Sequence, residues 1–307
     1  MESRAETDDE RLRVVTITSG GRRAILLTSD GVSIEAEHHP GPHPGPRGSG
    51  RVAIVVAHGF TGALERPAIR AAAANLARHG GVVTFSFRGH GRSGGRSTVG
   101  DREVLDLDTA VRWARELGYQ RVATVGFSMG GSVVLRHAGG RAAGGPQPSG
   151  ERYAVRRPEA GQAPPAPSAA RDASGGVDAV VAVSSPARWY YRGTAPMRRL
   201  HWVVTRPAGR LVSRLGMRTR VHSRPWNPVP PSPVESVPYI APTPLLIVHG
   251  DRDAYFPLDH PRSLAAAAGP GGAELWIERG FGHAENAADP ALLDRIGQWL
   301  TARVAAV

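Results

Sequence analysis

The chain has 307 residues and a formal net charge of +11. It contains neither lysine nor cysteine, which excludes a Schiff-base or P-loop lysine, a thiol nucleophile, disulfides and cysteine-ligated zinc. The joint abundance of Arg, Ala, Gly and Pro is typical of coding bias in a GC-rich genome. We therefore expect no nucleic-acid partner, although excess arginine can also indicate a nucleic-acid or anionic membrane surface.

The N-terminal segment 1–13 is polar and carries acidic residues, with no apolar stretch behind it. No run elsewhere approaches the ~18 apolar residues of a membrane span. These features predict a cytoplasmic protein without an integral membrane segment.

Residues 13–37 alternate short β-rich runs with glycine-containing turns, which predicts an antiparallel lead-in. The next segment, 38–50, is rich in histidine, proline and glycine. His38, His39 and His43 could form a metal site, but the interleaved Pro and Gly favour a flexible surface connection.

From residue 52 the pattern becomes apolar strand, glycine-rich turn and helix, repeated. Near-continuous apolar runs are typical of strands buried on both faces. They cover residues 52–57, 81–87, 121–125, 177–183 and 244–249, with a further run at 273–278. Helical periodicity follows in 101–118 and again after Asp289, which is placed to cap a C-terminal helix that begins with Pro290. This alternation predicts an α/β fold with a mostly parallel central sheet and helices on both faces.

Two stretches interrupt this rhythm. Residues 139–176 have few large apolar side chains and many Pro, Gly and Ala, which predicts a disordered insertion. Residues 186–240 contain aromatic residues and a helical pattern, followed by a proline-rich run. We expect one core built from 1–138 and 177–307, with a small cap inserted at about 186–240.

The pattern G-x-S-x-G occurs twice, around Ser93 and around Ser128. A nucleophile elbow needs a serine on a sharp turn that joins a strand directly to a helix. Ser128 follows the strand 121–125 and opens a helix-compatible run, whereas Ser93 has no helix until about residue 101. Context therefore favours Ser128.

A serine nucleophile needs a base, and the base needs an orienting group. In a parallel sheet these partners lie on loops at the carboxyl ends of later strands. The loop after 244–249 offers Asp251 and Asp253, and the loop after 273–278 offers His283.

Five motifs now stand in order: AHGFTG, FRGHGRSGG, GFSMGG, HGDRDAYFP and GFGHAE. With them the chain resembles the α/β-hydrolases, in the group of serine esterases, lipases and serine aminopeptidases. The resemblance covers nearly the whole chain apart from the N-terminal tail and the insertion. It implies a serine hydrolase without cofactor or metal, acting on the carboxylic ester, thioester or small amide bond of a small-molecule acyl substrate.

The resemblance also implies roles for single residues. Ser128 would be the nucleophile, His283 the base, and Asp253, rather than its neighbour Asp251, the acid. The backbone N–H groups of Phe60 and Met129 would form the oxyanion hole.

Other histidines and one arginine fall within the motifs. For His58, His90 and His249 we expect roles as hydrogen-bonded loop anchors. Arg88 is expected to pin loops through a carboxylate, and substrate contact is the alternative for it.

In the cap, arginine recurs every four residues from Arg206 to Arg218, along one face if a helix starts near Pro207. A solvated face is the favoured interpretation; an acidic acyl substrate or an anionic lipid surface is the alternative. Trp189, Tyr190 and Trp202 could line a substrate pocket or pack the cap against the core.

Two alternatives to a serine hydrolase stay open. The fold also hosts lyases and cofactor-free peroxidases on similar triads. A hydrolase-like binding protein could capture a ligand without turnover. The oligomeric state cannot be predicted from these patterns.

Overall fold

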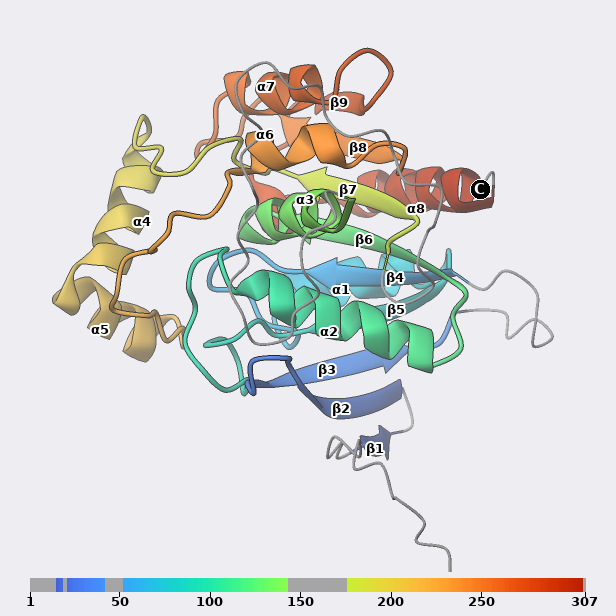
Figure 1. Ribbon diagram of the computed structural model, residues 1–307, viewed down its shortest axis with the longest axis horizontal. Coiled ribbons are helices and arrows are strands. Elements are labelled where there is room, and N and C mark those ends of the chain that lie inside the picture. The colour runs from blue at the N-terminus through green and yellow to red at the C-terminus, as the bar shows by residue number, and fades with distance from the viewer. Residues whose placement is uncertain (1–14, 19–20, 42–51, 143–175, 306–307) are drawn as a thin grey trace, which may run out of the picture.

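The computed structural model describes residues 15–18, 21–41, 52–142 and 176–305. Their strands form one nine-stranded sheet in the order β1-β2-β3-β5-β4-β6-β7-β8-β9. Helices cover both faces of this sheet, as Figure 1 shows. The predicted fold class, an α/β fold with a mostly parallel sheet, is confirmed.

The N-terminal strands are antiparallel, as predicted. β1 (Val15–Thr18), β2 (Gly21–Leu27) and β3 (Ser33–His39) form a meander that joins the rest of the sheet through β5 (Gly81–Phe85). The predicted break at residue 38 is wrong, because β3 continues through His39. His38 is buried, with Nε2 2.8 Å from the hydroxyl of Tyr119. His43 lies outside the described residues.

The remaining strands are parallel: β4 (Val52–Ala57), β6 (Arg121–Phe127), β7 (Ala179–Val183), β8 (Leu245–Gly250) and β9 (Glu274–Glu278). Successive side chains of a strand point to opposite faces. Within β4, Val55 therefore packs into one core and Ile54 and Val56 into the other. Apolar residues are needed at every position, which explains the unbroken runs in the sequence.

One face of the sheet is covered by α1 (Pro67–Leu76) and α8 (Pro290–Ala305). The other face is covered by α2 (Glu103–Glu116), α3 (Met129–Ala142) and α7 (Asp259–Ala267). The predicted cap of α8 is present, since the Leu292 N–H donates to the side chain of Asp289 at 2.7 Å.

The predicted insertion starts too early. α3 continues through Ala142, so residues 139–142 are helical. Of the rest of the predicted insertion, residues 143–175 lie outside the described residues.

The cap lies between β7 and β8. It contains α4 (Ala195–Thr205) and α5 (Pro207–Gly216), followed by the short α6 (Pro233–Ser236) and a 3₁₀ turn at Val237–Tyr239. Pro207 separates the two longer helices because it has no N–H to continue α4. Only Arg210 and Arg214 of the predicted arginine row therefore lie within one helix. Figure 1 shows the α4–α5 hairpin projecting at one end of the sheet.

Within the described part of the chain, no helix combines the length and the apolar character needed to cross a bilayer.

Candidate active site

Ser128 lies on the turn that joins β6 directly to α3, with a backbone φ of 51°. This left-handed conformation is strained for a residue with a side chain. The turn is held by the Ser128 N–H, which donates to the carbonyl of Val183 at 2.9 Å. A Cβ on Gly126 would collide with the carbonyl of Gly130, and one on Gly130 with the carbonyl of Ala57. Glycine is therefore required on both sides of the serine.

The structure brings the three predicted triad residues together. His283 Nε2 is 2.9 Å from Ser128 Oγ, and His283 Nδ1 is 2.8 Å from Asp253 Oδ2. Ser128 follows β6, Asp253 follows β8 and His283 follows β9, so all three lie at the carboxyl ends of parallel strands. This is the arrangement of a nucleophile, a base and an orienting carboxylate.

The two oxygens of Asp253 have separate partners. Oδ2 faces His283, while Oδ1 accepts the N–H groups of Tyr255 at 2.8 Å and Phe256 at 3.1 Å. Burial acts to raise the pKa of Asp253, but the hydrogen bond and charge of His283 and the two N–H donors outweigh it and lower the pKa below its ordinary value. The carboxylate therefore stays ionised. Asp251, the alternative acid, is exposed and accepts the N–H of Gly280 at 2.6 Å.

Tyr255 was not predicted as a site residue. Its ring stacks on the imidazole of His283, with centroids 4.2 Å apart and planes 25° apart. The stack limits rotation of the imidazole while its two nitrogens face Ser128 and Asp253. The motif DAYFP places this aromatic ring two residues after Asp253, but the sequence alone does not show where the ring points.

Phe60 and Met129, the predicted oxyanion-hole residues, line the same cavity as Ser128. The Met129 N–H is at the first position of α3, where helix geometry leaves N–H groups without an intrahelical partner. Phe60 lies inside a turn closed by the Gly62 N–H on the carbonyl of Gly59, a bond that does not use the Phe60 N–H. Neither of these local bonds uses the N–H of Phe60 or Met129, and both residues lie beside Ser128.

Glu285 holds the loop that carries Phe60, a role that the sequence analysis missed. Its Oε1 accepts the N–H of Gly59 at 2.9 Å, and the side chain is buried. Burial raises the pKa of Glu285, and the hydrogen bonds from its own N–H and from Gly59 only partly oppose this. The signal available in the sequence was an acidic residue two positions after His283, at the end of the motif GFGHAE.

His58 anchors the same loop from the other side. Its Nε2 accepts the N–H of Phe87 at 3.0 Å, which places the proton on Nδ1, 2.7 Å from the carbonyl of Gly59. Burial, with a contribution from His90, lowers the pKa of His58 well below its ordinary value. This neutral histidine connects two loops and lies outside the triad.

The other motif residues also connect loops. His249 Nε2 is 2.8 Å from the carbonyl of Phe256, and His90 Nδ1 is 3.0 Å from the carbonyl of Arg88. The buried Arg88 donates to Asp106 and Asp30, as expected for a residue that pins loops through carboxylates.

Ser93 is the serine of the second G-x-S-x-G pattern. It is buried, donates to the carbonyl of Ser86 at 2.6 Å and accepts the N–H of Glu35. It is a loop residue.

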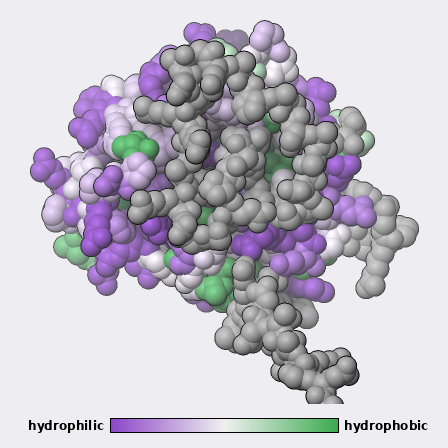
Figure 2. All heavy atoms as spheres, in the orientation of Figure 1, coloured by the Kyte–Doolittle hydropathy of each residue, from purple (hydrophilic) through white to green (hydrophobic). Residues whose placement is uncertain are grey.

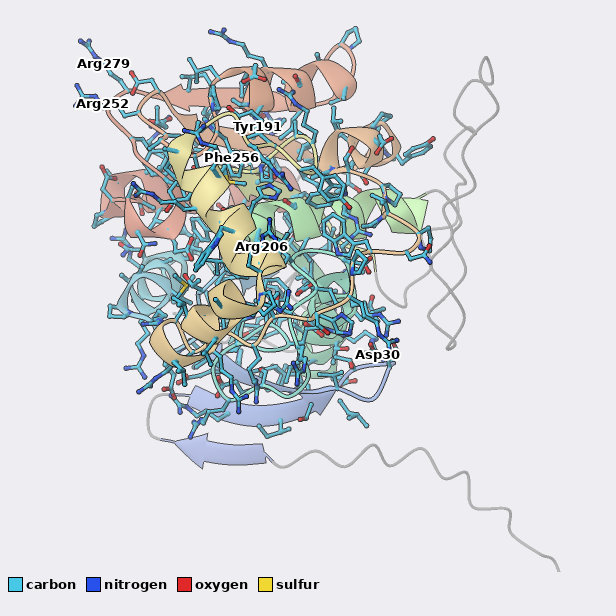
Figure 3. All side chains as sticks on the ribbon, turned by 90° about the vertical axis from the view of Figure 1, so that its left-hand side faces the viewer. Asp30, Tyr191, Arg206, Arg252, Phe256 and Arg279 are labelled. Carbon is cyan, nitrogen blue, oxygen red and sulfur yellow. The ribbon has the colours of Figure 1, made fainter. Side chains whose placement is uncertain are left out.

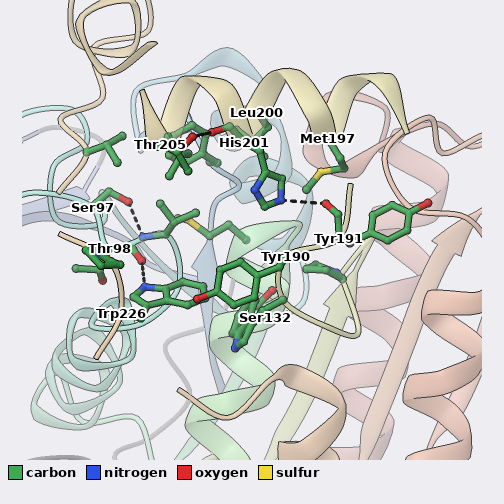
Figure 4. Close-up of a pocket in the computed structure, with 18 of the residues that line it drawn as sticks. Ser97, Thr98, Ser132, Tyr190, Tyr191, Met197, Leu200, His201, Thr205 and Trp226 are labelled. Atoms are coloured by element: carbon green, nitrogen blue, oxygen red, sulfur yellow. Dashed lines mark hydrogen bonds between the residues drawn. The ribbon is translucent and has the colours of Figure 1, made fainter. Parts of the chain in front are cut away.

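A cavity of about 330 Å³ opens beside Ser128. Figure 4 shows Met197, Leu200 and His201 of α4 on one side and Ser132 of α3 on the other. Trp189 and Tyr190, two of the pocket candidates, line this cavity. The third pocket candidate, Trp202, was placed wrongly: it is 48% exposed and is not among the cavity-lining residues.

Among the described residues, no group of three or more His, Asp and Glu side chains is arranged to hold a metal ion.

Comparison with known sequences identifies the family. The profile described as "Alpha/beta hydrolase family" matches residues 54–294, which include Ser128, Asp253 and His283. No curated protein matches the chain.

Solved structures with the same fold include an esterase from Pyrococcus furiosus, at 20% sequence identity and a TM-score of 0.61, covering 95% of this chain and 98% of that one. An alpha/beta hydrolase from Penicillium sp. sh18 has 18% identity and a TM-score of 0.60, covering 96% and 99%. A serine hydrolase without lid from Xanthomonas campestris has 16% identity and a TM-score of 0.52, covering 94% and 95%. Identities this low show similarity of fold alone.

Proposed function

The chain belongs to the alpha/beta hydrolase family, and we propose that it is a serine hydrolase that cleaves carboxylic ester, thioester or small amide bonds through an acyl-enzyme. The observation that carries this proposal is the continuous hydrogen-bonded row from Ser128 through His283 to Asp253. A serine hydroxyl is a weak nucleophile unless a base accepts its proton, and this row supplies both the base and the group that orients it.

In the first half-reaction, Ser128 Oγ attacks the acyl carbonyl while its proton passes to His283 Nε2. The imidazolium that forms is stabilised by Asp253, whose lowered pKa keeps it anionic. The same proton is then given to the leaving group, which departs as an alcohol, thiol or amine and leaves the acyl group on Ser128. Water, activated by His283, completes the hydrolysis by the same steps.

Negative charge develops on the carbonyl oxygen during each attack. We assign its stabilisation to the N–H groups of Phe60 and Met129, which are fixed by a turn and by a helix start before the charge develops. Removing one such donor typically costs on the order of 10²–10³ in rate. Glu285 and His58 act as positioning residues because they hold Gly59 and not the substrate.

The cavity supports an apolar acyl group. Met197, Leu200 and Val204 of α4 and Phe256 line it beside Ser128. Since a mostly apolar pocket gains affinity from buried hydrocarbon, we expect esters with a carbon chain longer than acetate to be the better substrates.

The first test is hydrolysis of p-nitrophenyl esters from acetate to palmitate by the wild type and by Ser128→Ala. We expect turnover that falls by on the order of 10⁴–10⁶ in the variant, because the triad acts as a unit. Ser132→Ala is the matched control, since Ser132 lies one helical turn further along α3 and lines the same cavity. Its rate should stay close to that of the wild type.

A fluorophosphonate probe separates two kinds of failure. Labelling of Ser128 without turnover of any ester would show a competent nucleophile with another substrate, such as an amide, or with lyase or peroxidase chemistry. No labelling and no turnover would overturn the proposal and favour a binding protein.

A further inference from the structure

The cap concentrates the positive charge of the protein. Residues 186–234 contain ten arginines and no aspartate or glutamate, which leaves 28 arginines against 27 acidic residues in the rest of the chain. Nearly the whole net charge of +11 therefore comes from this one segment. Within the described part of the chain, Arg188 is the one cap arginine that forms an ion pair, with Asp259.

The outer face of the cap is also apolar. The exposed fractions are 56% for Leu211, 47% for Val212 and 72% for Leu215 on α5, and 48% for Trp202 on α4. On most surface helices large apolar residues face the core and polar ones face water. On α5 the reverse holds for the apolar residues: the large aliphatic side chains face water and small residues face the protein.

The packing of α5 explains the reversal. Its buried residues are the small Gly209 and Ser213, four positions apart. A Cβ on Gly209 would collide with the backbone of Trp202, so the two helices approach closely through small residues. The three aliphatic side chains of α5, Leu211, Val212 and Leu215, are thereby left on the outer surface.

Exposed arginines and leucines lie close together on this surface. Positions four apart lie on the same side of a helix, so Leu211 and Leu215 form one row. Arg206, Arg214 and Arg218 are exposed around it, whereas Arg210 is half-buried and lines the cavity beside Ser128. Figure 2 shows a hydrophobic area at the edge where Figure 1 places α5, bordered by hydrophilic residues. Figure 3, which faces this side, shows Arg206 at the junction of α4 and α5.

We propose that the α4–α5 hairpin is a docking surface for an anionic phospholipid membrane, with α5 lying in the plane of the interface. Aliphatic and tryptophan side chains enter the boundary between headgroups and acyl chains, while arginines pair with lipid phosphates. A nucleic acid would use the arginines but offers no apolar phase for the exposed leucines. The charge and the apolar row together therefore favour a membrane.

The docking surface and the candidate active site share α4. Met197, Leu200 and His201 of this helix face the cavity beside Ser128, while Trp202 faces outward. A docked hairpin would hold the cavity next to the lipid. The docking itself does not depend on the proposed hydrolysis.

The test is flotation of the full chain with vesicles of phosphatidylcholine alone or mixed with phosphatidylglycerol, across a series of salt concentrations. We expect partition onto the mixed vesicles, weak partition onto phosphatidylcholine, and loss of binding as salt screens the arginines. Two cap variants, Leu211→Ser with Leu215→Ser, and Arg206→Gln with Arg214→Gln and Arg218→Gln, should each lower the partition coefficient by about ten-fold or more.

Matched controls carry the same changes on exposed residues of the core. Ile25→Ser with Ile277→Ser, and Arg70→Gln with Arg262→Gln and Arg279→Gln, should leave partition unchanged. Because all of these positions are exposed, thermal unfolding should be similar in all variants, which verifies that each is folded.

Three outcomes would overturn the proposal. The first is no binding of the wild type to mixed vesicles, and the second is equal loss in the core controls. The third is tighter binding to a DNA duplex than to vesicles with no effect of the leucine substitutions, which would identify a nucleic-acid surface instead.

Discussion

The base of the active site and the cap are built in opposite ways. At the base, Ser128, Asp253 and His283 follow parallel strands of the sheet, and each makes hydrogen bonds to defined partners. In the cap, two helices meet through the small residues of α5, and the leucines, the valine and Arg214 of α5 face water.

This difference separates chemistry from recognition. A reaction needs atoms held within fractions of an ångström, which the ends of hydrogen-bonded strands and fixed N–H donors provide. Binding a substrate chain or a lipid surface needs area and charge, and the cap supplies both with few internal constraints. Changes at the base should therefore affect the rate and the stability, whereas changes in the cap should affect selectivity.

The largest effect is expected from Asp253→Asn. An asparagine holds His283 in the wrong tautomer and cannot stabilise the imidazolium, so kcat should fall by about 10⁴-fold. Asp251→Asn is the matched control, since its carboxylate faces Gly280 and not His283. Steady-state kinetics on the best p-nitrophenyl ester measures kcat of both variants. A similar fall in kcat in the two variants would contradict the assignment of Asp253 as the triad acid.

A second test compares a core arginine with a cap arginine. Arg88→Met leaves Asp106 and Asp30 without their buried partner, and we expect the free energy of unfolding to fall by about 3–5 kcal/mol. Arg214→Gln, on the exposed face of α5, should change it by less than about 0.5 kcal/mol. Urea unfolding gives both values, and equal losses would contradict the contrast between the two regions.

Glu285→Ala tests the positioning of the oxyanion loop. It leaves the Gly59 N–H without its acceptor, so we expect kcat to fall about 10- to 100-fold with little change in KM. Glu285→Gln keeps an oxygen acceptor at the same place and should restore most of the rate. If Glu285→Ala and Glu285→Gln lower kcat equally, the hydrogen bond from the Gly59 N–H does not position the oxyanion loop.

A smaller effect is expected on the cap side of the cavity. Leu200→Ala enlarges the cavity and should lower kcat/KM for long-chain esters by about 3- to 10-fold while leaving acetate nearly unchanged. Leu211→Ala, on the outer face of α5, should change neither value with a water-soluble ester. A uniform loss for all chain lengths would place Leu200 outside the acyl site.

The smallest effect concerns pH. Because the pKa of Asp253 is lower in the folded chain than in the unfolded chain, ionised Asp253 stabilises the fold above the unfolded pKa of about 3.9. This contribution is lost as pH falls through the folded pKa. The difference in unfolding free energy between wild type and Asp253→Asn should therefore narrow on acidification below about pH 4, and a difference that widens would contradict the lowered pKa.

The sheet was predictable because parallel strands must be apolar on both faces. Such strands stand out as unbroken runs, and five of the predicted runs correspond to β4, β5, β6, β7 and β8. His38 shows where this signal ends. A polar residue can continue a strand when a distant partner such as Tyr119 satisfies it, and no local pattern shows that partner.

The active site was predictable to the level of candidate residues. The glycines around Ser128 are local requirements of a strand-to-helix turn, so the sequence carries them directly. The choice between Asp251 and Asp253 rested on resemblance, and the catalytic roles stay proposals. Glu285 and Tyr255 were missed because their partners, Gly59 and His283, lie elsewhere in the chain.

By itself, the sequence determined the alternation of strands and helices, the place of the nucleophile elbow and the excess of arginine in the cap. These properties depend on neighbours within a few positions. Tertiary structure alone decided which carboxylate meets His283, that Trp202 faces outward and that α5 exposes its leucines. Periodicity defines the faces of a helix, but which face meets the protein depends on how closely another backbone can approach, and here Gly209 decides it.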